Sequence, residues 1–361
     1  MQYGNKVEDL LEQIIELGKD EEKQTGFCIG NTAKIDKNGL YFTPVRSTEV
    51  MVLGGVIVYS EKQAIDIAKA VDGKVDYILV DAEKKIPDKM SLTGEPANVE
   101  RSVRETIRKS TLWIYKGNDL AVEAIDGLLT HLTKNSLSGI GGMKIAILGA
   151  GNLGCKLALN LVERGAHVFI TKRDSQKLNL IVDALNYIKP VFTKAQVVGM
   201  TDNDEAAKGA NILIGMTQGT PIITPEMIEN LSPGALVVDG GKGTLSPAAI
   251  KMAESREIPV FRLDVGAALE GKINSLFATE DNVAKRMGRC LFNDLPIVSG
   301  GLMGRSGEIV VDNINNPRII YGIADGKGDF LRDLSPEHLL NIRKVRETIR
   351  GKAVSSTRKT S

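Results

Sequence analysis

The sequence predicts an α/β protein: a Rossmann-type, doubly wound parallel sheet plus a smaller α/β domain, completed by C-terminal helices. Three observations predict this class. Apolar strand-like runs alternate with helical patterns after residue 143, a glycine-rich turn follows the first of these runs, and 42% of the 361 residues are apolar, enough for two cores. The predicted domains are an N-terminal substrate domain (1–140), a nucleotide-binding domain (141–272), a segment packing back on the first domain (273–350) and a disordered tail (351–361).

Apolar periodicity and turn residues predict the elements of the first domain. An acidic amphipathic helix is expected within residues 1–20, where Leu10, Ile14 and Leu17 form an apolar stripe. The other helices are expected at 62–71, 98–109 and 120–132, the last of them leading into the second domain. Strands are expected at 26–30, 50–58, 77–80 and 112–115.

In the second domain, strands alternate with helices, which predicts a parallel sheet covered on both faces. The expected strands are 145–148, 168–170, 196–199, 211–215, 235–239 and 260–263. Helices are expected after the glycine turn and at 175–187, 225–230 and 247–255. Two C-terminal helices are expected at 284–292 and 336–349.

The turn after the strand 145–148 has the spacing G-x-G-x-x-G, supplied by Gly149, Gly151 and Gly154. The first glycine permits a tight turn, the second lets a pyrophosphate approach the backbone, and the third lets the helix pack on the strand. A strand precedes the turn and a helix follows it, so we expect a bound dinucleotide, also contacted by Asn152 and Leu153. The alternative is a glycine turn that only connects strand to helix.

The end of the next strand favours NADP over NAD. An acidic residue there usually binds the ribose 2′-hydroxyl of NAD, whereas a 2′-phosphate requires cations. Thr171 occupies the position of that acid, and Lys172 and Arg173 follow it. The alternative for the two cations is ordinary solvated charge after a strand, and NAD stays possible because Asp174 is close by.

Two further turns follow strands of the same sheet. Ligands bind at the carboxyl ends of parallel strands, and both turns are rich in glycine. They are therefore expected to contact the nicotinamide half of the cofactor, although ordinary turn chemistry is the alternative. The residues concerned are Met216, Thr217 and Gln218 in the first turn and Asp239, Gly240 and Gly241 in the second.

Composition restricts the class of partner. The net charge of +1 provides no field for nucleic acid or an anionic membrane. The three cysteines, Cys28, Cys155 and Cys290, are unclustered, which argues against disulfides or a zinc site, and no metal is predicted. With no signal peptide or long apolar run, we expect a cytoplasmic protein. We also expect a small-molecule substrate and a homodimer.

Residues 144–174 resemble the nucleotide unit of the shikimate dehydrogenase-like group, whose Asn-Arg-Thr triplet holds the 2′-phosphate. Lys172, Arg173 and Asp174 align with that triplet, so the resemblance assigns this role to Arg173. Residues 116–119 and 238–241 are similar to elements of the predicted amino acid dehydrogenases related to long-chain acyl-carrier-protein reductases. The resemblance covers about residues 112–270 and implies an amino acid dehydrogenase-like N-terminal domain.

Hydride transfer to a carbonyl needs a proton donor at the oxygen. The three histidines are expected to be structural, and the resemblance implies a lysine and aspartate pair instead. Two positions offer such pairs. Asp81 follows the strand 77–80 directly, with Lys84 and Lys85 shortly after it. Lys116, Asn118 and Asp119 stand where the first domain meets the second. The alternatives are a solvated loop for the first two and helix N-caps for Asn118 and Asp119.

These observations predict an NAD(P)-dependent oxidoreductase, NADP favoured, acting on a small polar hydroxy, keto or amino acid-type substrate. A cysteine-dependent thioester reductase is one alternative, and a non-enzymatic cofactor-sensing protein is another. The glycine-rich loop at 300–307 is equally consistent with a connection or with an anion contact through Arg305.

Overall fold

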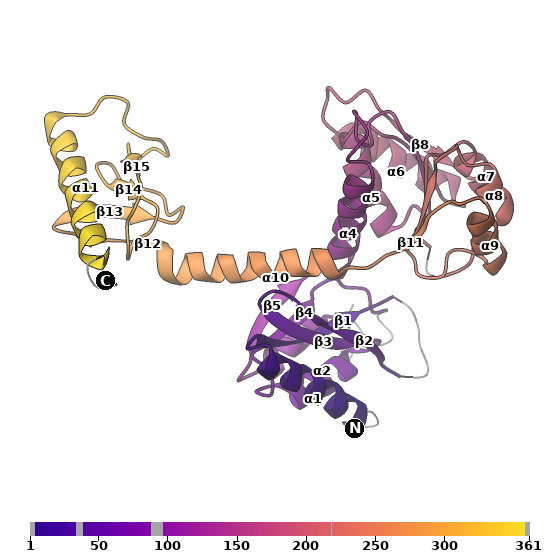
Figure 1. Ribbon diagram of the computed structural model, residues 1–361, viewed down its shortest axis with the longest axis horizontal. Helices are drawn as coiled ribbons and strands as arrows, with labels where there is room; N and C mark the ends of the chain where they lie inside the picture. Colours follow the sequence, from indigo (N-terminus) through magenta and orange to yellow (C-terminus); the bar gives the residue numbers. More distant parts are fainter. Residues whose placement is uncertain (1–3, 34–38, 88–96, 218, 358–361) are drawn as a thin grey trace. The chain divides into compact units, whose positions relative to one another are not determined.

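The computed structural model describes residues 4–33, 39–87, 97–217 and 219–357. The chain divides into two compact units, residues 1–272 and 273–361. The first unit contains an N-terminal domain and a nucleotide-binding domain, coloured indigo to magenta and magenta to brown in Figure 1.

The N-terminal domain has a five-stranded sheet in the order β2-β3-β1-β4-β5. Its strands are β1 (Gln24–Asn31), β2 (Tyr41–Ser47), β3 (Met51–Val58), β4 (Tyr77–Asp81) and β5 (Thr111–Tyr115). Three helices pack into one apolar core with this sheet: α1 (Gly4–Asp20), α2 (Glu61–Val71) and α3 (Val99–Thr106).

Sequence analysis did not identify β2. This edge strand is antiparallel to β3, while the other pairs are parallel. Its register shifts between Thr43 and Arg46, and Pro44 lies within that irregularity. Proline is tolerated at an edge or a bulge because no ladder hydrogen bond is required from it there, but it masks the strand in the sequence.

The nucleotide-binding domain has a six-stranded parallel sheet in the order β8-β7-β6-β9-β10-β11. In order of appearance this is 3-2-1-4-5-6, the Rossmann arrangement, which confirms the predicted fold class. The strands are β6 (Lys144–Leu148), β7 (His167–Thr171), β8 (Val197–Met200), β9 (Ile212–Gly215), β10 (Leu236–Asp239) and β11 (Val260–Arg262). The helices are α4 (Gly117–Leu132), α5 (Asn152–Glu163), α6 (Ser175–Ile188), α7 (Asn203–Ala207), α8 (Pro225–Glu229) and α9 (Pro247–Ser255).

Alternate residues of β6 enter different cores, so both faces of this sheet are buried. Ile145 and Ile147 pack with α4, α5 and α6, whereas Ala146 and Leu148 pack with α7, α8 and α9. The strands end in register: Leu148 lies opposite both Thr171 and Gly215, and Gly215 lies opposite Asp239. The turns that follow these strands therefore share one edge of the sheet.

The second unit has its own sheet and core, which the sequence analysis missed. Helix α10 (Gly266–Asp281) begins in the first unit and continues into the second, followed by a π-helical turn, Asn282–Arg286. The sheet order is β12-β13-β14-β15. Its strands are β12 (Gly288–Phe292), β13 (Leu295–Ser299), β14 (Ile309–Val311) and β15 (Ile320–Ile323), and α11 (Pro336–Thr357) packs with them.

The predicted helix at 284–292 is wrong beyond Arg286, because Gly288–Phe292 pairs with β13 as a hairpin. The two connecting residues, Asn293 and Asp294, have φ of 47° and 63°. Positive φ at both central positions is the two-residue turn that Asn and Asp favour, so a local signal was present. Helix α11 continues to Thr357, through most of the segment expected to be a tail, and residues 358–361 lie outside the described residues. Packing of this segment against the first domain stays a prediction.

Candidate active site

The three glycines of the nucleotide turn have the three environments expected of them. Gly149 has φ +126°, a conformation that a side chain would strain. A Cβ at Gly154 would lie 2.1 Å from the carbonyl oxygen of Gly149, so α5 packs against the turn only with glycine there. A Cβ at Gly151 would meet no described atom within 4 Å. The backbone there is open on the side from which a pyrophosphate would approach, at the N-terminus of α5.

A cavity of about 670 Å³ lies along this turn and the end of β7. Gly149 and Gly151 line it at the turn, and Met216 and Thr217 line it beyond β9. Gln218, the next residue predicted to contact the cofactor, lies outside the described residues. The volume falls in the range of small-molecule and cofactor sites.

Thr171, Lys172, Arg173 and Lys177 line the end of this cavity that an adenosine ribose would occupy. Lys172 Nζ donates to the carbonyl oxygen of Ala150 at 3.2 Å. Sequence analysis missed Lys177, although its position in the first turn of α6 was a usable signal.

Asp174, the acidic residue that could bind the ribose of NAD, forms its hydrogen bond with the start of α6. Its Oδ1 accepts the N–H of Lys177 at 3.0 Å as the N-cap of α6, and its Oδ2 lies 3.3 Å from Lys177 Nζ. The backbone hydrogen bond from Lys177 lowers the pKa of Asp174 below its usual value. The carboxylate therefore caps the helix, and Asp174 also lines the cavity beside Lys172 and Arg173.

The remaining residues predicted to contact the cofactor have mixed roles. Leu153 and Met216 pack against the core beneath α5, and Met216 also lines the cavity. Asp239 is 4% exposed, and its carboxylate accepts hydrogen bonds from Gly243 N–H at 2.7 Å and from Thr244 N–H at 3.0 Å. Burial acts to raise the pKa of Asp239, but these bonds outweigh it and lower the pKa. Asp239 therefore braces its own turn.

Gly240 and Gly241 lie where that turn meets the turn after β9. A Cβ at Gly241 would lie 1.9 Å from the carbonyl oxygen of Thr217, and a Cβ at Gly240 would lie 2.3 Å from Met216 Sδ. These contacts leave no space for a side chain. Both glycines are therefore explained by the close approach of two turns at the carboxyl edge of the sheet.

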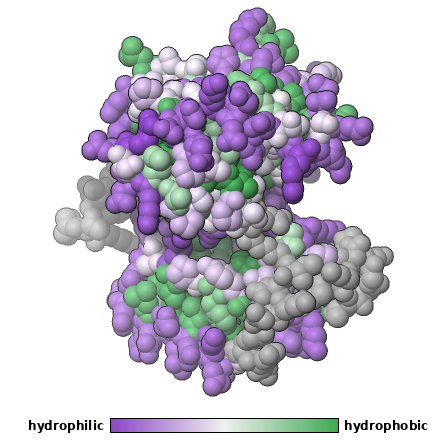
Figure 2. Space-filling view, turned by 90° about the vertical axis from the view of Figure 1, so that its right-hand side faces the viewer, coloured by the Kyte–Doolittle hydropathy of each residue, from purple (hydrophilic) through white to green (hydrophobic). Residues whose placement is uncertain are grey.

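A second cavity, of about 270 Å³, is lined by residues of both domains of the first unit. Figure 2 shows a hollow between the two lobes of this unit, whose outer surface is mostly hydrophilic. Asn31, Asp81 and Tyr115, at the carboxyl ends of β1, β4 and β5, line the cavity from the N-terminal domain. The nucleotide-binding domain contributes Lys242.

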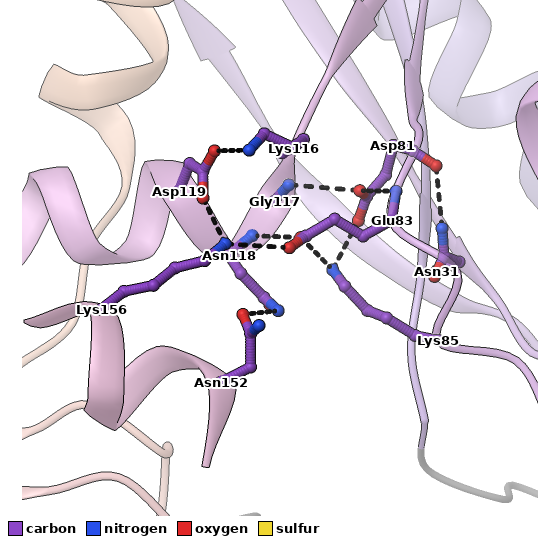
Figure 3. A network of polar contacts seen from close by, with 10 residues as sticks. All are labelled: Asn31, Asp81, Glu83, Lys85, Lys116, Gly117, Asn118, Asp119, Asn152 and Lys156. Carbon is purple, nitrogen blue, oxygen red and sulfur yellow. Dashed lines mark hydrogen bonds and ion pairs between the residues drawn. The ribbon is translucent and has the colours of Figure 1, made fainter. Parts of the chain in front are cut away.

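Lys85 and Asp81 form an ion pair in the wall of the second cavity (Figure 3). Lys85 Nζ lies 2.6 Å from Asp81 Oδ2, and the two side chains are 17% and 2% exposed. The other carboxylate oxygen accepts the N–H of Gly117 at 3.2 Å. Asn31 Nδ2 donates to the backbone oxygen of Asp81, and Asn31 Oδ1 has no hydrogen-bond partner among the described residues. Lys85, one of the two predicted lysines of this loop, is thus paired with an aspartate.

Glu83, which sequence analysis missed as a site residue, connects this pair to the second domain. Its carboxylate accepts the N–H of Asn118 at 2.7 Å and lies 3.0 Å from Lys85 Nζ and 3.5 Å from Lys156 Nζ. Burial acts to raise the pKa of Glu83, but the hydrogen bond from Asn118 and the two lysines lower it overall.

The side chains of Asn118 and Asp119 join the start of α4 to α5 within the nucleotide-binding domain. Asn118 Nδ2 donates to Asn152 Oδ1 at 3.0 Å, directly at the nucleotide turn. Asp119 accepts from Lys156 at 2.5 Å and pairs with Lys116. Helix α4 begins at Gly117 with Lys116 in the cap position, so the alternative that Asn118 or Asp119 caps this helix is wrong.

The other candidate catalytic residues, namely Lys84, the histidines and the cysteines, are less suited to proton or group transfer in this cavity. Lys84 is exposed and lines neither cavity, and no histidine lines either one among the described residues. Cys28 lines the second cavity, but burial raises the pKa of its thiol to about 12. Burial also raises the pKa of Cys155, and Cys290 lies in the second unit. A thiolate nucleophile therefore finds no support near this cavity.

Two surveys of the described part of the chain are negative. No described helix is long and apolar enough to cross a membrane. Among the same residues, no cluster of three or more histidine, cysteine or acidic side chains has the arrangement of a metal site.

Comparison with known proteins supports an oxidoreductase. Residues 144–243 match the family model described as NADP oxidoreductase, coenzyme F420-dependent. This region contains the nucleotide turn and both glycine-rich turns that follow it. The match, together with the fold, indicates a nicotinamide cofactor. No curated protein sequence matches the chain.

Solved structures with remote similarity include a dipicolinate synthase chain from Bacillus halodurans, at 15% identity and a TM-score of 0.35, covering 71% of this chain and 98% of that one. Another is L-tryptophan dehydrogenase from Nostoc punctiforme, at 13% identity and a TM-score of 0.39, covering 70% and 73%. A third is the pyruvate reductase of Chlamydomonas reinhardtii, at 15% identity and a TM-score of 0.33, covering 68% and 79%. Similarity this remote carries no inference about substrate.

Proposed function

We propose that the protein is an NADP(H)-dependent oxidoreductase that interconverts a small polar carbonyl compound with the corresponding alcohol or, with ammonia as co-reactant and loss of water, with the corresponding amine. The observation that carries this proposal is the Lys85–Asp81 pair in the wall of a cavity shared by both domains, joined through Asn118 to the nucleotide turn. A proton donor and a hydride donor must meet at one carbonyl group, and this arrangement brings the two halves together.

The nucleotide turn fits a pyrophosphate because Gly151 is open and α5 begins at Asn152. Backbone N–H groups at that helix end would bind the phosphate oxygens. When bound, a reduced nicotinamide supplies the hydride.

Lys85 is the proposed acid. In the reducing direction its ammonium group donates a proton to the carbonyl oxygen as the carbon accepts the hydride, so the product carries both hydrogens and Lys85 becomes neutral. Asp81 orients Lys85 and stabilises its charged form between turnovers. Glu83 is a second carboxylate at Lys85 Nζ and ties that lysine to the start of α4.

Three observations support NADP over NAD. Lys172, Arg173 and Lys177 line the adenosine end of the first cavity, and the Asp174 carboxylate is engaged as a helix cap. Thr171 is a neutral residue at the position where an NAD site has its acid. The shikimate dehydrogenase-like assignment and the homodimer stay proposals.

Titration of the purified protein with NADPH and with NADH tests the cofactor. We expect NADPH to bind at least about tenfold more tightly, a difference of about 1.4 kcal/mol. The double variant Lys172→Gln/Arg173→Gln should lose this preference by weakening NADPH alone. Arg101→Gln, an exposed arginine of the N-terminal domain, is the control. Equal affinities in the wild type would contradict the NADP assignment, and no response to either nucleotide would overturn the proposed function.

A further inference from the structure

The second cavity has more positive than negative charge in its wall. Arg46, Lys85 and Lys242 line it, and Asp81 is the single acidic residue among the described residues that do so. Lys85 offsets Asp81 at 2.6 Å, which leaves Arg46 and Lys242 to set the charge of the rest of the cavity. Much of the remaining wall is apolar, including Leu53, Ile57 and Leu269. Lys242 is exposed and the Arg46 side chain is 32% exposed, so both cations can be reached by a ligand from solvent.

Arg46 is held in place but keeps donors for a ligand. Its Nη2 pairs with Asp264 Oδ1 at 2.9 Å, and the Asp264 side chain is 65% exposed and does not line the cavity. A Cβ at Gly266 would lie 2.9 Å from Arg46 Nη1, so the guanidinium rests against the first residue of α10. A guanidinium has five N–H donors, in a fork that matches a carboxylate. One ion pair therefore leaves most of this fork available.

Lys242 stands in a conformation that favours glycine. Its φ is +58°, between Gly241 and Gly243 in the turn after β10. A lysine pays a conformational cost there that a glycine would avoid. Among the described residues its ammonium group makes no hydrogen bond and no ion pair within 4 Å, although at longer range it adds to a backbone hydrogen bond and to Arg46 in lowering the pKa of Asp264, and the residue lines the cavity. The side chain, and not the backbone, therefore accounts for a lysine at this position.

The size of the cavity limits the ligand. At roughly 30 Å³ per water molecule, 270 Å³ corresponds to the space of a small metabolite. The ligand must pair with Arg46 and Lys242, one from each domain, and place a reacting group near Lys85.

We propose that the substrate is a small carboxylic acid whose carboxylate is bound by Arg46 of β2 and Lys242 of the turn after β10. The carbonyl, hydroxyl or amino group that reacts then lies toward Lys85 and Asp81. This inference rests on the proposed function and adds the class of substrate and two specificity residues, one from each domain.

Calorimetric titration of the full chain, with and without saturating NADP, tests this assignment. The probes are 2-oxo and 2-hydroxy acids of two to six carbons, each paired with its primary amide, which has a similar shape and no charge. We expect at least one acid to bind at least about tenfold more tightly than its amide, as charge-assisted bonds require. Amides that bind as tightly as the acids, or a panel in which no acid binds the NADP-loaded protein, would overturn the proposal.

Variants of the two members of the Arg46–Asp264 ion pair show whether Arg46 binds the ligand or only holds the two domains together. Arg46→Gln should weaken acid binding at least about tenfold. Asp264→Asn should leave acid binding unchanged or tighten it, because Arg46 loses its competing anion, while the asparagine oxygen still accepts the N–H of Gly266. If both variants weaken acid binding alike, the pair only braces the domains and the proposal fails.

Lys242→Asn keeps a residue that tolerates positive φ and removes the charge. It should also weaken acid binding by about tenfold, and Arg101→Gln should not. NADPH affinity of the Arg46 variant, measured separately, distinguishes the two levels of inference. Lost acid binding with intact NADPH binding supports the carboxylate site. Lack of NADPH binding in the wild type would instead overturn the proposed function.

Discussion

The two halves of the candidate active site are built in different ways. The nucleotide half draws seven of the fourteen described residues that line its cavity from one continuous segment, residues 149–174, in which the glycine turn and the end of β7 supply them. The substrate half draws Asn31, Asp81 and Gly117 from three strand ends far apart in the sequence. A continuous motif carries its geometry in its spacing. A site assembled by a sheet depends on which strands are neighbours.

The largest expected effect tests the substrate half. Lys85→Met should lower turnover by roughly 10²–10⁴-fold, because the proton donor is lost, while NADPH affinity should change by less than about twofold. The adjacent Lys84→Met is the matched control and should retain turnover, since Lys84 is exposed and lines neither cavity. Steady-state kinetics with the acid identified by calorimetry provides the measurement. Equal losses in both variants would show that the loop acts only as a charged surface.

In the nucleotide half, substitutions at two glycines of the same turn distinguish an effect on protein stability from an effect on NADPH binding. Gly154→Ala should destabilise the protein by about 2–4 kcal/mol, because its Cβ would collide with the Gly149 carbonyl at 2.1 Å. Gly151→Ala should leave stability within about 0.5 kcal/mol and weaken NADPH binding by about tenfold or more, since the methyl group would occupy the path of the pyrophosphate. Urea unfolding and NADPH titration of both variants measure this. A Gly151 variant that binds NADPH normally would contradict the assigned position of the pyrophosphate.

The nucleotide half could be predicted more fully than the substrate half, because the first is a continuous motif and the second is assembled from separate strands. The alternation of strands and helices, the nucleotide turn and the residues after β7, β9 and β10 could be predicted, because apolar runs and glycines mark a parallel sheet and its carboxyl edge, whereas the strand order was not predicted. Lys85 was predicted by its place after β4. Its partner Asp81 stood in the same stretch, which was considered for a lysine and aspartate pair, but no role was assigned to the bridging Glu83 or to Lys156, since contacts such as Lys156–Asp119 join residues that no spacing relates.

The unpredicted parts have identifiable physical causes. Pro44 obscured β2, and with it Arg46, because proline lowers the expectation of a strand. In the second unit, the run 288–292 was interpreted as helical, although Asn293 and Asp294 marked a hairpin after it. The short strands of this mixed sheet, in which β13 and β14 are parallel and the other pairs antiparallel, give weaker patterns than the long alternation of a nucleotide-binding domain.

A smaller effect tests the link between the halves. Glu83→Gln should lower the free energy of unfolding by about 1–2 kcal/mol at about pH 7, because an anion bound by an N–H group and two lysines is lost. The folded-state pKa of Glu83 is lowered, so its contribution is complete above the ordinary value of 4.5 and disappears as the pH falls through the folded-state value. The difference in the free energy of unfolding between wild type and Glu83→Gln should therefore be smaller at about pH 3 than at neutral pH.

Glu105→Gln is the control for that measurement. Glu105 pairs with Arg101 on the surface, where the two side chains are 65% and 67% exposed. Its loss should cost less than about 0.5 kcal/mol. A gap for Glu83→Gln that stays constant between neutral and acid pH would show that shape, and not charge, accounts for its effect.

The smallest expected effect concerns the thiol in the substrate half, and it decides between two chemistries. Cys28 lines the cavity beside Tyr115, where a thioester reductase would place a nucleophile. Burial raises the pKa of this thiol to about 12, so the reactive thiolate is a negligible fraction at neutral pH. Cys28→Ser should keep turnover of the identified acid within about twofold, and iodoacetamide should modify the exposed Cys290 well before Cys28. Loss of turnover in Cys28→Ser, with NADPH affinity and stability retained, would instead assign the chemistry to the thiol. Lys85 would then have no role beyond its ion pair with Asp81.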